Sequence, residues 1–375
     1  MQDSTNSPLS ILDKVMESKE ESEKQEFSPQ EIISQLLRKL TSKEADVLKR
    51  RFGLNENEKQ TLEAIGNHYS VTRERIRQIE NLSIKKIKQS SEFDAIVKNA
   101  EHVVSNILNQ NGGVVEQEFL MAEIFPTGYS EGNERAVLFI IAELLSDRFQ
   151  KVPIDKKYKA SWKLKITQLD FLDEVIEETS KLLEKQGKPQ SIQKLFEDFS
   201  QTEFYNHNRE RLNEKILESY LEVSQKISRN PFDEYGLANW GSIVPKRMND
   251  KIYLILKKEG KPMHFVEIAK RITEIFHKKA YPPTVHNELI LNKEYVLVGR
   301  GIYALTEWGY KKGVVKDVIK DVLVKAEKPL TRDEIVKRVL EQRIVKKNTI
   351  HLALTNKKNF IKSSNGKYSI APKEE

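Results

Sequence analysis

The sequence predicts a mainly α-helical protein with small β wings, in which an N-terminal helix-turn-helix domain precedes tandem winged-helix domains. Two observations support this fold class. Residues 61–80, TLEAIGNHYSVTRERIRQIE, have the pattern of a helix, a tight turn and a second, arginine-rich helix. After residue 92 the chain repeats one spacing four times: a leucine, a Gly or Lys-Pro turn, and a second aliphatic residue.

Length and composition limit the class of protein. A chain of 375 residues favours several small domains. No apolar run approaches the roughly 20 residues of a membrane-spanning helix, and the acidic N-terminus resembles neither a signal peptide nor a transit peptide. Without cysteine the chain has no disulfides and no thiolate zinc site. We therefore expect a cytoplasmic protein.

The net charge of +7 is unevenly distributed along the chain. Basic residues exceed acidic ones by 4 in residues 28–92 and by 14 in residues 241–375. Acidic residues exceed basic ones by 4 in residues 1–27 and by 7 in residues 93–240. Basic segments favour phosphate contacts through counterion release, although a lysine-rich solvated surface is an equally good interpretation of the C-terminal part. The acidic middle is better suited to spacing or to protein binding, because it repels duplex DNA.

The N-terminal 92 residues divide into a tail and a helical domain. Residues 1–27 are rich in Ser, Glu and Lys and predict a disordered acidic tail. Residues 28–92 are expected to be helical throughout, starting with proline at position 29. Thr41 and Glu44 have the spacing of a capping box, and Gly53 is a helix-stop signal.

The second helix of the helix-turn-helix has two distinct faces. Val71, Ile76 and Ile79 supply an apolar stripe, while positions 73, 74, 77, 78 and 81 share the opposite face. That face carries Arg73, Glu74, Arg77, Gln78 and Asn81. Arg pairs with guanine, Gln with adenine, and Glu accepts a hydrogen bond from cytosine. The alternative interpretation is an ordinary solvated, charged helix face.

These segments resemble a known module. LLRKLTSKEADVLKRRFGL followed by TLEAIGNHYSVTRERIRQIENLSIKKIK is similar to the fourth conserved region of sigma-70-type bacterial sigma factors, which recognises the promoter −35 element. The resemblance implies base contacts by Arg73, Glu74 and Gln78, and phosphate contacts around Thr61, Leu62, Thr72, Arg77 and Lys85. The predicted DNA-binding residues are Thr61, Leu62, Thr72, Arg73, Glu74, Arg75, Arg77, Gln78, Asn81 and Lys85.

The same resemblance implies a protein partner and shows two departures. In the family this region also docks on the flap of the RNA polymerase β subunit, which corresponds here to the helices from Leu36 to Phe52. Ser70 stands where glycine is usual, and a positive φ there would cost on the order of 1 kcal/mol. Only 27 residues, with a net charge of −4, precede the module, so we expect the promoter-melting region of sigma factors to be missing.

The repeats after residue 92 predict four winged-helix-like units, each with three helices and a hairpin. The units are 93–166, 167–241, 242–312 and 313–372. Hairpins are expected at 296–305 and 360–370, with comparable strands at 160–164 and 235–240. Trp162, Trp240 and Trp308 fall at or just after these wings, which favours core roles.

The third unit carries a second resemblance. ILKKEGKPMHFVEIAKRITEIF and YVLVGRGIYALTEWGY are similar to the HARE-HTH winged helix, as in the N-terminal domain of the RNA polymerase delta subunit. The resemblance implies association with polymerase or DNA without fixing the contacts. The basic candidates are Lys278, Lys279, Lys293, Arg300, Lys346, Lys347, Lys357 and Lys358, and an ordinary surface role is equally compatible with each.

No motif points to catalysis. The seven histidines show no metal-ligand spacing, and the chain has neither a phosphate-binding loop nor a G-x-S-x-G motif. We therefore expect no enzymatic activity, no cofactor and no small-molecule substrate.

The sequence thus predicts a bacterial transcription factor related to sigma factors, nucleoid-associated, which binds double-stranded promoter DNA and core RNA polymerase. The alternative is a polymerase-associated interaction protein, delta-like or sigma-competing, in which DNA recognition is secondary. A third hypothesis is a non-catalytic subunit of a nuclease or methyltransferase.

Overall fold

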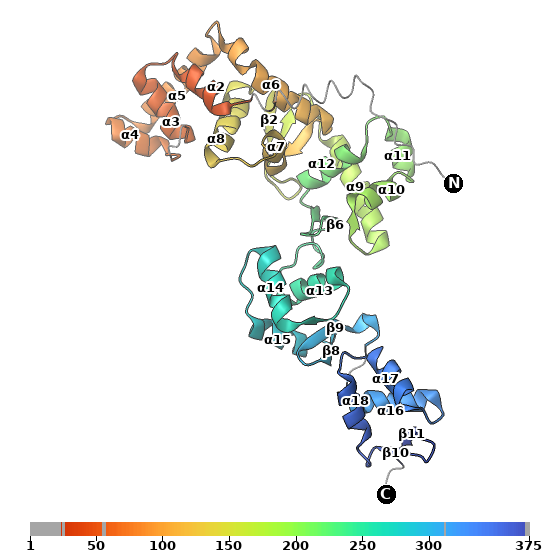
Figure 1. Cartoon of the computed structure of the whole chain (residues 1–375). Helices are drawn as coiled ribbons and strands as arrows, with labels where there is room; N and C mark the ends of the chain where they lie inside the picture. Colours follow the sequence, from red (N-terminus) through yellow and green to blue (C-terminus); the bar gives the residue numbers. More distant parts are fainter. Residues whose placement is uncertain (1–23, 25–26, 55–57, 311–312, 372–375) are drawn as a thin grey trace. The chain divides into compact units, whose positions relative to one another are not determined.

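The computed structural model describes residues 24, 27–54, 58–310 and 313–371. The predicted acidic tail therefore lies almost entirely outside the described residues. The chain is mainly helical with small antiparallel sheets and forms two compact units (Figure 1). The first unit ends at Ser228 and includes 235–237; the second comprises 229–234 and the chain from 238 onwards. No helix in the described ranges is long and apolar enough to cross a membrane.

From residue 27 onwards, the described part of the first unit begins with four helices. They are α2 (Pro29–Leu37), α3 (Ser42–Phe52), α4 (Leu62–Tyr69) and α5 (Arg73–Lys88). Pro29 opens α2, as predicted, since its missing N–H would be unpaired at that position anyway. The capping box before α3 is confirmed: the backbone N–H of Thr41 donates to the Glu44 carboxylate at 2.8 Å, and the Glu44 N–H donates to the Thr41 hydroxyl at 3.4 Å. Gly53 ends α3 with a φ of 68°.

Two repeated segments complete the first unit. The first contains α6 (Phe93–Gln110), β1 (Val114–Glu116), α7 (Gln117–Ile124), α8 (Glu131–Phe139), the π-helix η1 (Ile140–Leu144), β2 (Phe149–Val152) and β3 (Ser161–Leu164). The second contains α9 (Asp170–Gln186), β4 (Gln190–Ser191), α10 (Ile192–Phe199), α11 (Glu203–Asn208), α12 (Glu214–Val223), β5 (Ile227–Arg229) and β6 (Glu234–Leu237). Their sheets have the orders β1-β3-β2 and β4-β6-β5. Each sheet thus has three strands, one more than the predicted hairpin.

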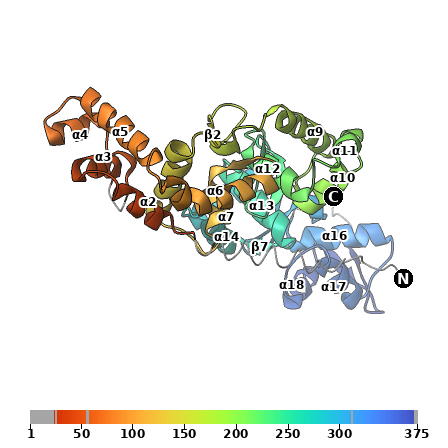
Figure 2. The same ribbon diagram turned by 90° about the horizontal axis from the view of Figure 1, so that it is seen from above.

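A continuous hydrophobic core crosses residue 92, where the sequence predicted a domain boundary. Helix α2 packs against α6 and α8 (Figure 1, Figure 2). Ile33 and Leu48 are fully buried in the same core as Val104 and Phe139. The ring of Phe52 lies 4.6 Å from that of Phe139. Helices α2 and α3 and the C-terminal part of α5 therefore depend on the first repeat for their burial.

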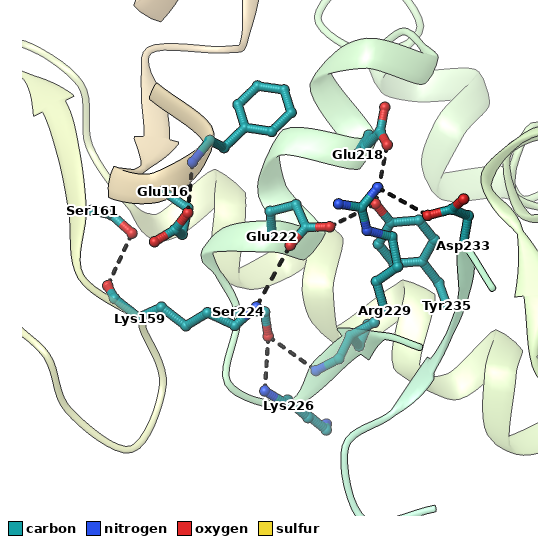
Figure 3. A network of polar contacts seen from close by, with 12 residues as sticks. Glu116, Lys159, Ser161, Glu218, Glu222, Ser224, Lys226, Arg229, Asp233 and Tyr235 are labelled. Carbon is teal, nitrogen blue, oxygen red and sulfur yellow. Dashed lines mark hydrogen bonds and ion pairs between the residues drawn. The ribbon is translucent and has the colours of Figure 1, made fainter. Parts of the chain in front are cut away.

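The two repeats of the first unit are joined by hydrogen bonds to β1 and its neighbours. The hydroxyl of Ser219 on α12 donates to the carbonyl of Val114 at 2.9 Å, and that of Tyr220 donates to the carbonyl of Gly112 at 3.0 Å. The Lys159 ammonium lies 3.7 Å from the Glu222 carboxylate. Figure 3 shows the polar side chains around Glu222 and Ser224 at this junction. The acidic repeats are thus held together by buried, specific contacts.

The second unit contains the two C-terminal repeats. The third repeat consists of α13 (Met248–Glu259), β7 (Met263–His264), α14 (Phe265–Phe276), α15 (Pro282–Leu291), β8 (Tyr295–Gly299), β9 (Ile302–Leu305) and the 3-10 helix η2 (Thr306–Trp308). The fourth consists of α16 (Val315–Ala326), α17 (Arg332–Leu340), α18 (Lys347–Leu354), β10 (Phe360–Lys362) and β11 (Tyr368–Ile370). Both hairpins lie at the predicted positions, and each repeat has its own core.

The tryptophans differ in their environments. Trp162 lies on β3 and is 3% exposed, so its predicted core role is confirmed. Trp308 is partly buried against the third repeat's core. Trp240 follows β6, outside the strand, and is half-buried.

We expect Phe139→Ala to lower the free energy of unfolding by about 3–5 kcal/mol, because it opens a cavity in the core shared by α2, α3 and the first repeat. Helices α2 to α5 should then unfold in the same transition as the first repeat, which circular dichroism in urea would measure on the full chain. Ile166→Ala, at a side chain 88% exposed, should change stability by less than about 0.5 kcal/mol. Independent melting of the N-terminal helices would contradict the shared core.

Candidate nucleic-acid interface

A small hydrophobic core of its own holds α4 and α5 in the helix-turn-helix arrangement. Val47 from α3, Ile65 from α4 and Ile76 from α5 are fully buried in it. Leu62, Tyr69, Val71 and Ile79 pack against this core and are partly buried. The predicted apolar stripe of α5 is therefore confirmed, and it leaves the opposite face of α5 outside the packing.

The turn between α4 and α5 requires a small residue at one position and a left-handed backbone conformation at another. Ser70 ends α4 with φ 54° and ψ 42°, so this position does need the conformation that glycine adopts most easily. The Val71 N–H donates to the carbonyl of Gly66 at 2.9 Å. A Cβ at Gly66 would lie 2.8 Å from the carbonyl oxygen of Val71. Gly66 is thus the site where the two helices approach each other closely.

Two predicted phosphate-contacting threonines also cap helices. The hydroxyl of Thr61 accepts from the Ala64 N–H at 3.1 Å, and that of Thr72 accepts from the Arg75 N–H at 3.2 Å. Both threonines are exposed. The helix N-terminus at Thr72 presents backbone N–H groups and a positive dipole end, which suit a phosphate.

The outer face of α5 is exposed at every predicted base-contacting position. The exposed residues of this face are Arg73, Glu74, Arg75, Arg77, Gln78, Asn81 and Lys85. Arg77 donates to both oxygens of Glu74, at 2.9 and 2.7 Å, and Arg75 donates to the Gln78 side-chain carbonyl at 3.2 Å. The hydrogen bond from Arg77 holds the pKa of Glu74 below its ordinary value. Glu74 is therefore ionised at neutral pH and able only to accept hydrogen bonds.

Arg73 and Lys85 differ from Arg77 and Lys86, which form ion pairs with glutamates. Neither forms an ion pair within the described part of the chain, so each can contact DNA without first breaking one. Lys86 instead binds Glu44 at 3.0 Å, and Lys88 donates to the Ser146 hydroxyl at 3.0 Å. Lys85 is thus free to contact a phosphate, whereas Lys86 and Lys88 are bound to other side chains of the protein.

Leu62 lies in a different environment from the other nine predicted DNA-binding residues. Its side chain is partly buried and packs against the small core, because it starts the apolar face of α4. The predicted phosphate contact at Leu62 therefore depends on the exposed start of α4 and not on the Leu62 side chain.

A polar network between α3 and α4 was not predicted from the sequence. The Tyr69 hydroxyl donates to the Asp46 carboxylate at 2.5 Å, and Arg50 donates to it at 2.6 Å. Arg51 reaches Glu80 on α5 at 3.3 Å. Only the Asp46–Arg50 pair, four residues apart on one helix, has a local sequence signal. The network fixes α3 against both helices of the interface.

Comparison with known proteins agrees with this geometry. The sequence model of the family described as Sigma-70, region 4 matches residues 36–89. Residues 36–89 form a sigma-70 region 4 domain. The chain is 42% identical over 66 residues to the RNA polymerase sigma factor RpoD of Neisseria gonorrhoeae, which covers 18% of this chain and 10% of that protein. It is 47% identical over 58 residues to the sigma factor SigA of Lactococcus lactis subsp. cremoris, covering 16% of each chain.

The region 4 similarity is confined to one end of the chain. These relatives are matched over 10–16% of their own length, so the similarity describes one domain and leaves the four repeats outside it. Among the residues with described positions, no group of His, Asp or Glu side chains could hold a metal ion.

Ser70→Gly should raise the free energy of unfolding by about 0.5–1 kcal/mol, because glycine adopts the left-handed turn without the steric cost of a Cβ. Thermal unfolding of the full chain measures this. Ser105→Gly, inside α6, should have the opposite sign, since glycine weakens a helix interior. A loss of stability at both positions would contradict the role assigned to the turn.

Acid should weaken the α3–α4 contact. Burial raises the pKa of Asp46, but hydrogen bonds from Tyr69 and Arg50 outweigh it, and the net pKa lies below the ordinary 3.8. A lowered folded-state pKa gives stability that is present above the ordinary pKa and is lost as the pH falls below about 4.

Asp46→Asn should therefore cost about 1 kcal/mol at pH 7 and flatten the acid side of the stability curve. Urea unfolding between pH 7 and pH 3 measures both effects. Asp94→Asn, at an exposed residue without a side-chain hydrogen bond in the described structure, is the matched control. Parallel curves for the parent and Asp46→Asn would exclude the network as a source of pH dependence.

Proposed function

We propose that this protein is a sequence-specific DNA-binding transcription factor related to sigma factors. It recognises a promoter −35-like element through the outer face of α5 and associates with RNA polymerase. The observation that carries this proposal is the region 4 domain at residues 36–89, whose helix α5 presents an exposed row of hydrogen-bonding side chains. We assign it a binding role without catalysis.

The chemistry of α5 divides into base and phosphate contacts. Arg73 pairs with guanine, Gln78 with adenine, and Glu74 accepts from cytosine. Thr72, Arg77 and Lys85 lie at the edges of this face and contact phosphates, which fix the position of the helix without specifying sequence. On binding DNA, Arg77 gives up its hydrogen bonds to Glu74, and Gln78 gives up its hydrogen bond from Arg75. Both side chains then form contacts with the DNA.

Arg73→Ala combined with Gln78→Ala should weaken binding to a −35-like duplex about tenfold or more, because each bidentate base contact is worth roughly 1–3 kcal/mol. Fluorescence anisotropy with the full chain measures the affinity. Arg209→Ala with Gln201→Ala removes the same residue types at exposed positions of the second repeat and should leave binding unchanged. Equal affinity of the double variant and the parent would rule out this face.

The four repeats are proposed to be tandem winged-helix domains, of which 242–312 is HARE-HTH-like. Each has helices followed by a small antiparallel sheet. Helix α15, the third helix of its repeat, contains no Lys or Arg and exposes Ile290 and Leu291. The equivalent α18 exposes Leu352 and carries one lysine, Lys347, at its start. Third helices that expose large apolar side chains suit a protein surface better than a DNA groove, so we assign the C-terminal repeats to protein binding.

Only part of the surface predicted to dock on the polymerase β flap is exposed. Within the segment from Leu36 to Phe52, the apolar residues Leu36 and Leu48 are buried against the first repeat. Arg38 and Lys39 remain exposed. We propose that any contact of this face with polymerase uses its exposed basic edge while the first repeat stays in place.

A second function is supported by the same apolar helices: a polymerase-associated interaction protein in which DNA recognition is secondary. Co-purification of core RNA polymerase with the full chain distinguishes the two. Under the second function the Arg73→Ala, Gln78→Ala variant still retains polymerase, and the parent shows no preference among duplex sequences. A sequence preference lost in that variant favours the first.

A further inference from the structure

The second unit contains a pocket that the proposed function does not use. Its volume is about 530 Å³, within the range of small-molecule sites. The wall is formed by the β8–β9 hairpin, the start of α16 and the loop between α17 and α18. Its apolar lining includes Leu297, Ile302, Val315, Ile344 and Val345.

The charged lining of this pocket is of one sign. Arg300, Arg343 and Lys346 line it, and none of its described lining residues is acidic. None of the three forms an ion pair within the described ranges of the chain. The nearby Asp317 attracts Arg343, but it is one carboxylate beside three cationic side chains. The pocket therefore carries a net positive charge.

Arg343 is built into the wall. It is 6% exposed, and it donates to the carbonyls of Gly313 and, at 2.8 Å, Leu297. Its Nε–H has no hydrogen-bond partner in the described structure. A buried guanidinium whose neighbours are carbonyls rather than a carboxylate is costly, and an anion close by would reduce that cost.

The pocket is held in shape by the backbone on one side. The Ile344 N–H donates to the carbonyl of Val298 on β8 at 3.0 Å. A Cβ at Gly299 would lie 2.9 Å from the carbonyl oxygen of Ile344. Strand β8 and the α17–α18 loop are thus in close contact, and the site needs little rearrangement to accept a ligand.

We propose that this pocket binds a small amphipathic anion: an aliphatic or aromatic body that carries one carboxylate. The apolar body lies against Leu297, Ile344 and Val345. The carboxylate lies near Arg343, between Arg300 and Lys346, whose exposed positions place their charges at the rim. A neutral or cationic ligand of the same shape binds less tightly, because it does not offset the positive charge of the pocket.

Isothermal titration calorimetry of the full chain without DNA tests this with octanoate, octan-1-ol and octyltrimethylammonium, all below their micelle concentrations. Octanoate should bind with one-to-one stoichiometry and at least tenfold more tightly than octanol, and the cation should not bind. Arg300→Ala with Lys346→Ala should raise the octanoate Kd about tenfold, with unchanged thermal unfolding because both side chains are exposed.

Lys357→Ala with Lys358→Ala is the control, since it removes the same number of charges at exposed positions outside the pocket lining. It should leave the octanoate Kd unchanged. Equal affinity for octanol and octanoate would overturn the proposal. An equal loss of octanoate affinity in the two double variants would also overturn it. Binding of an acidic, leucine-rich peptide to a protein that does not bind octanoate would also overturn it and would assign the surface to a protein partner.

Discussion

The burial of one face of α2 is the contact on which the rest of the first unit depends. Ile33, Leu36 and Leu37 are almost fully buried, in a core to which α3 and α5 also contribute Leu48 and Ile87. Helix α2 itself packs against α6 and α8 of the first repeat. Because apolar burial is the main favourable term in folding, the region 4 domain and the first repeat form one cooperative structure.

Helix α5 connects this large core to the small core of the helix-turn-helix. Ile87, near its C-terminus, is buried in the large core, and Ile76, near its N-terminus, is buried in the small one. Both residues lie on the inner side of the helix, so its outer face stays free along the whole recognition segment. The orientation of that face is thus set by the same packing that stabilises the unit.

In both units, hydrogen bonds to backbone carbonyls join neighbouring repeats. In the first unit, Ser219 and Tyr220 of the second repeat bind backbone carbonyls of the first through hydroxyl groups. In the second unit, Arg343 and Ile344 of the fourth repeat bind backbone carbonyls of β8 in the third. Both junctions have a pocket beside them: the pocket at the first has both acidic and basic residues in its lining, whereas the lining of the second is basic and apolar.

Features that depend on neighbours along the chain could be predicted from the sequence: the capping box at Thr41, the turn at Ser70, the outer face of α5 and the two C-terminal hairpins. Caps, turns and periodicity act over a few residues and therefore leave local patterns. Other features became known only from the folded chain: the packing of α2 against the first repeat, the ion pair between Lys86 and Glu44, and the burial of Arg343. The two- and three-residue strands β1, β4 and β7 were also missed. These features depend on contacts between distant segments, and a residue's type does not reveal the partner that the fold brings to it.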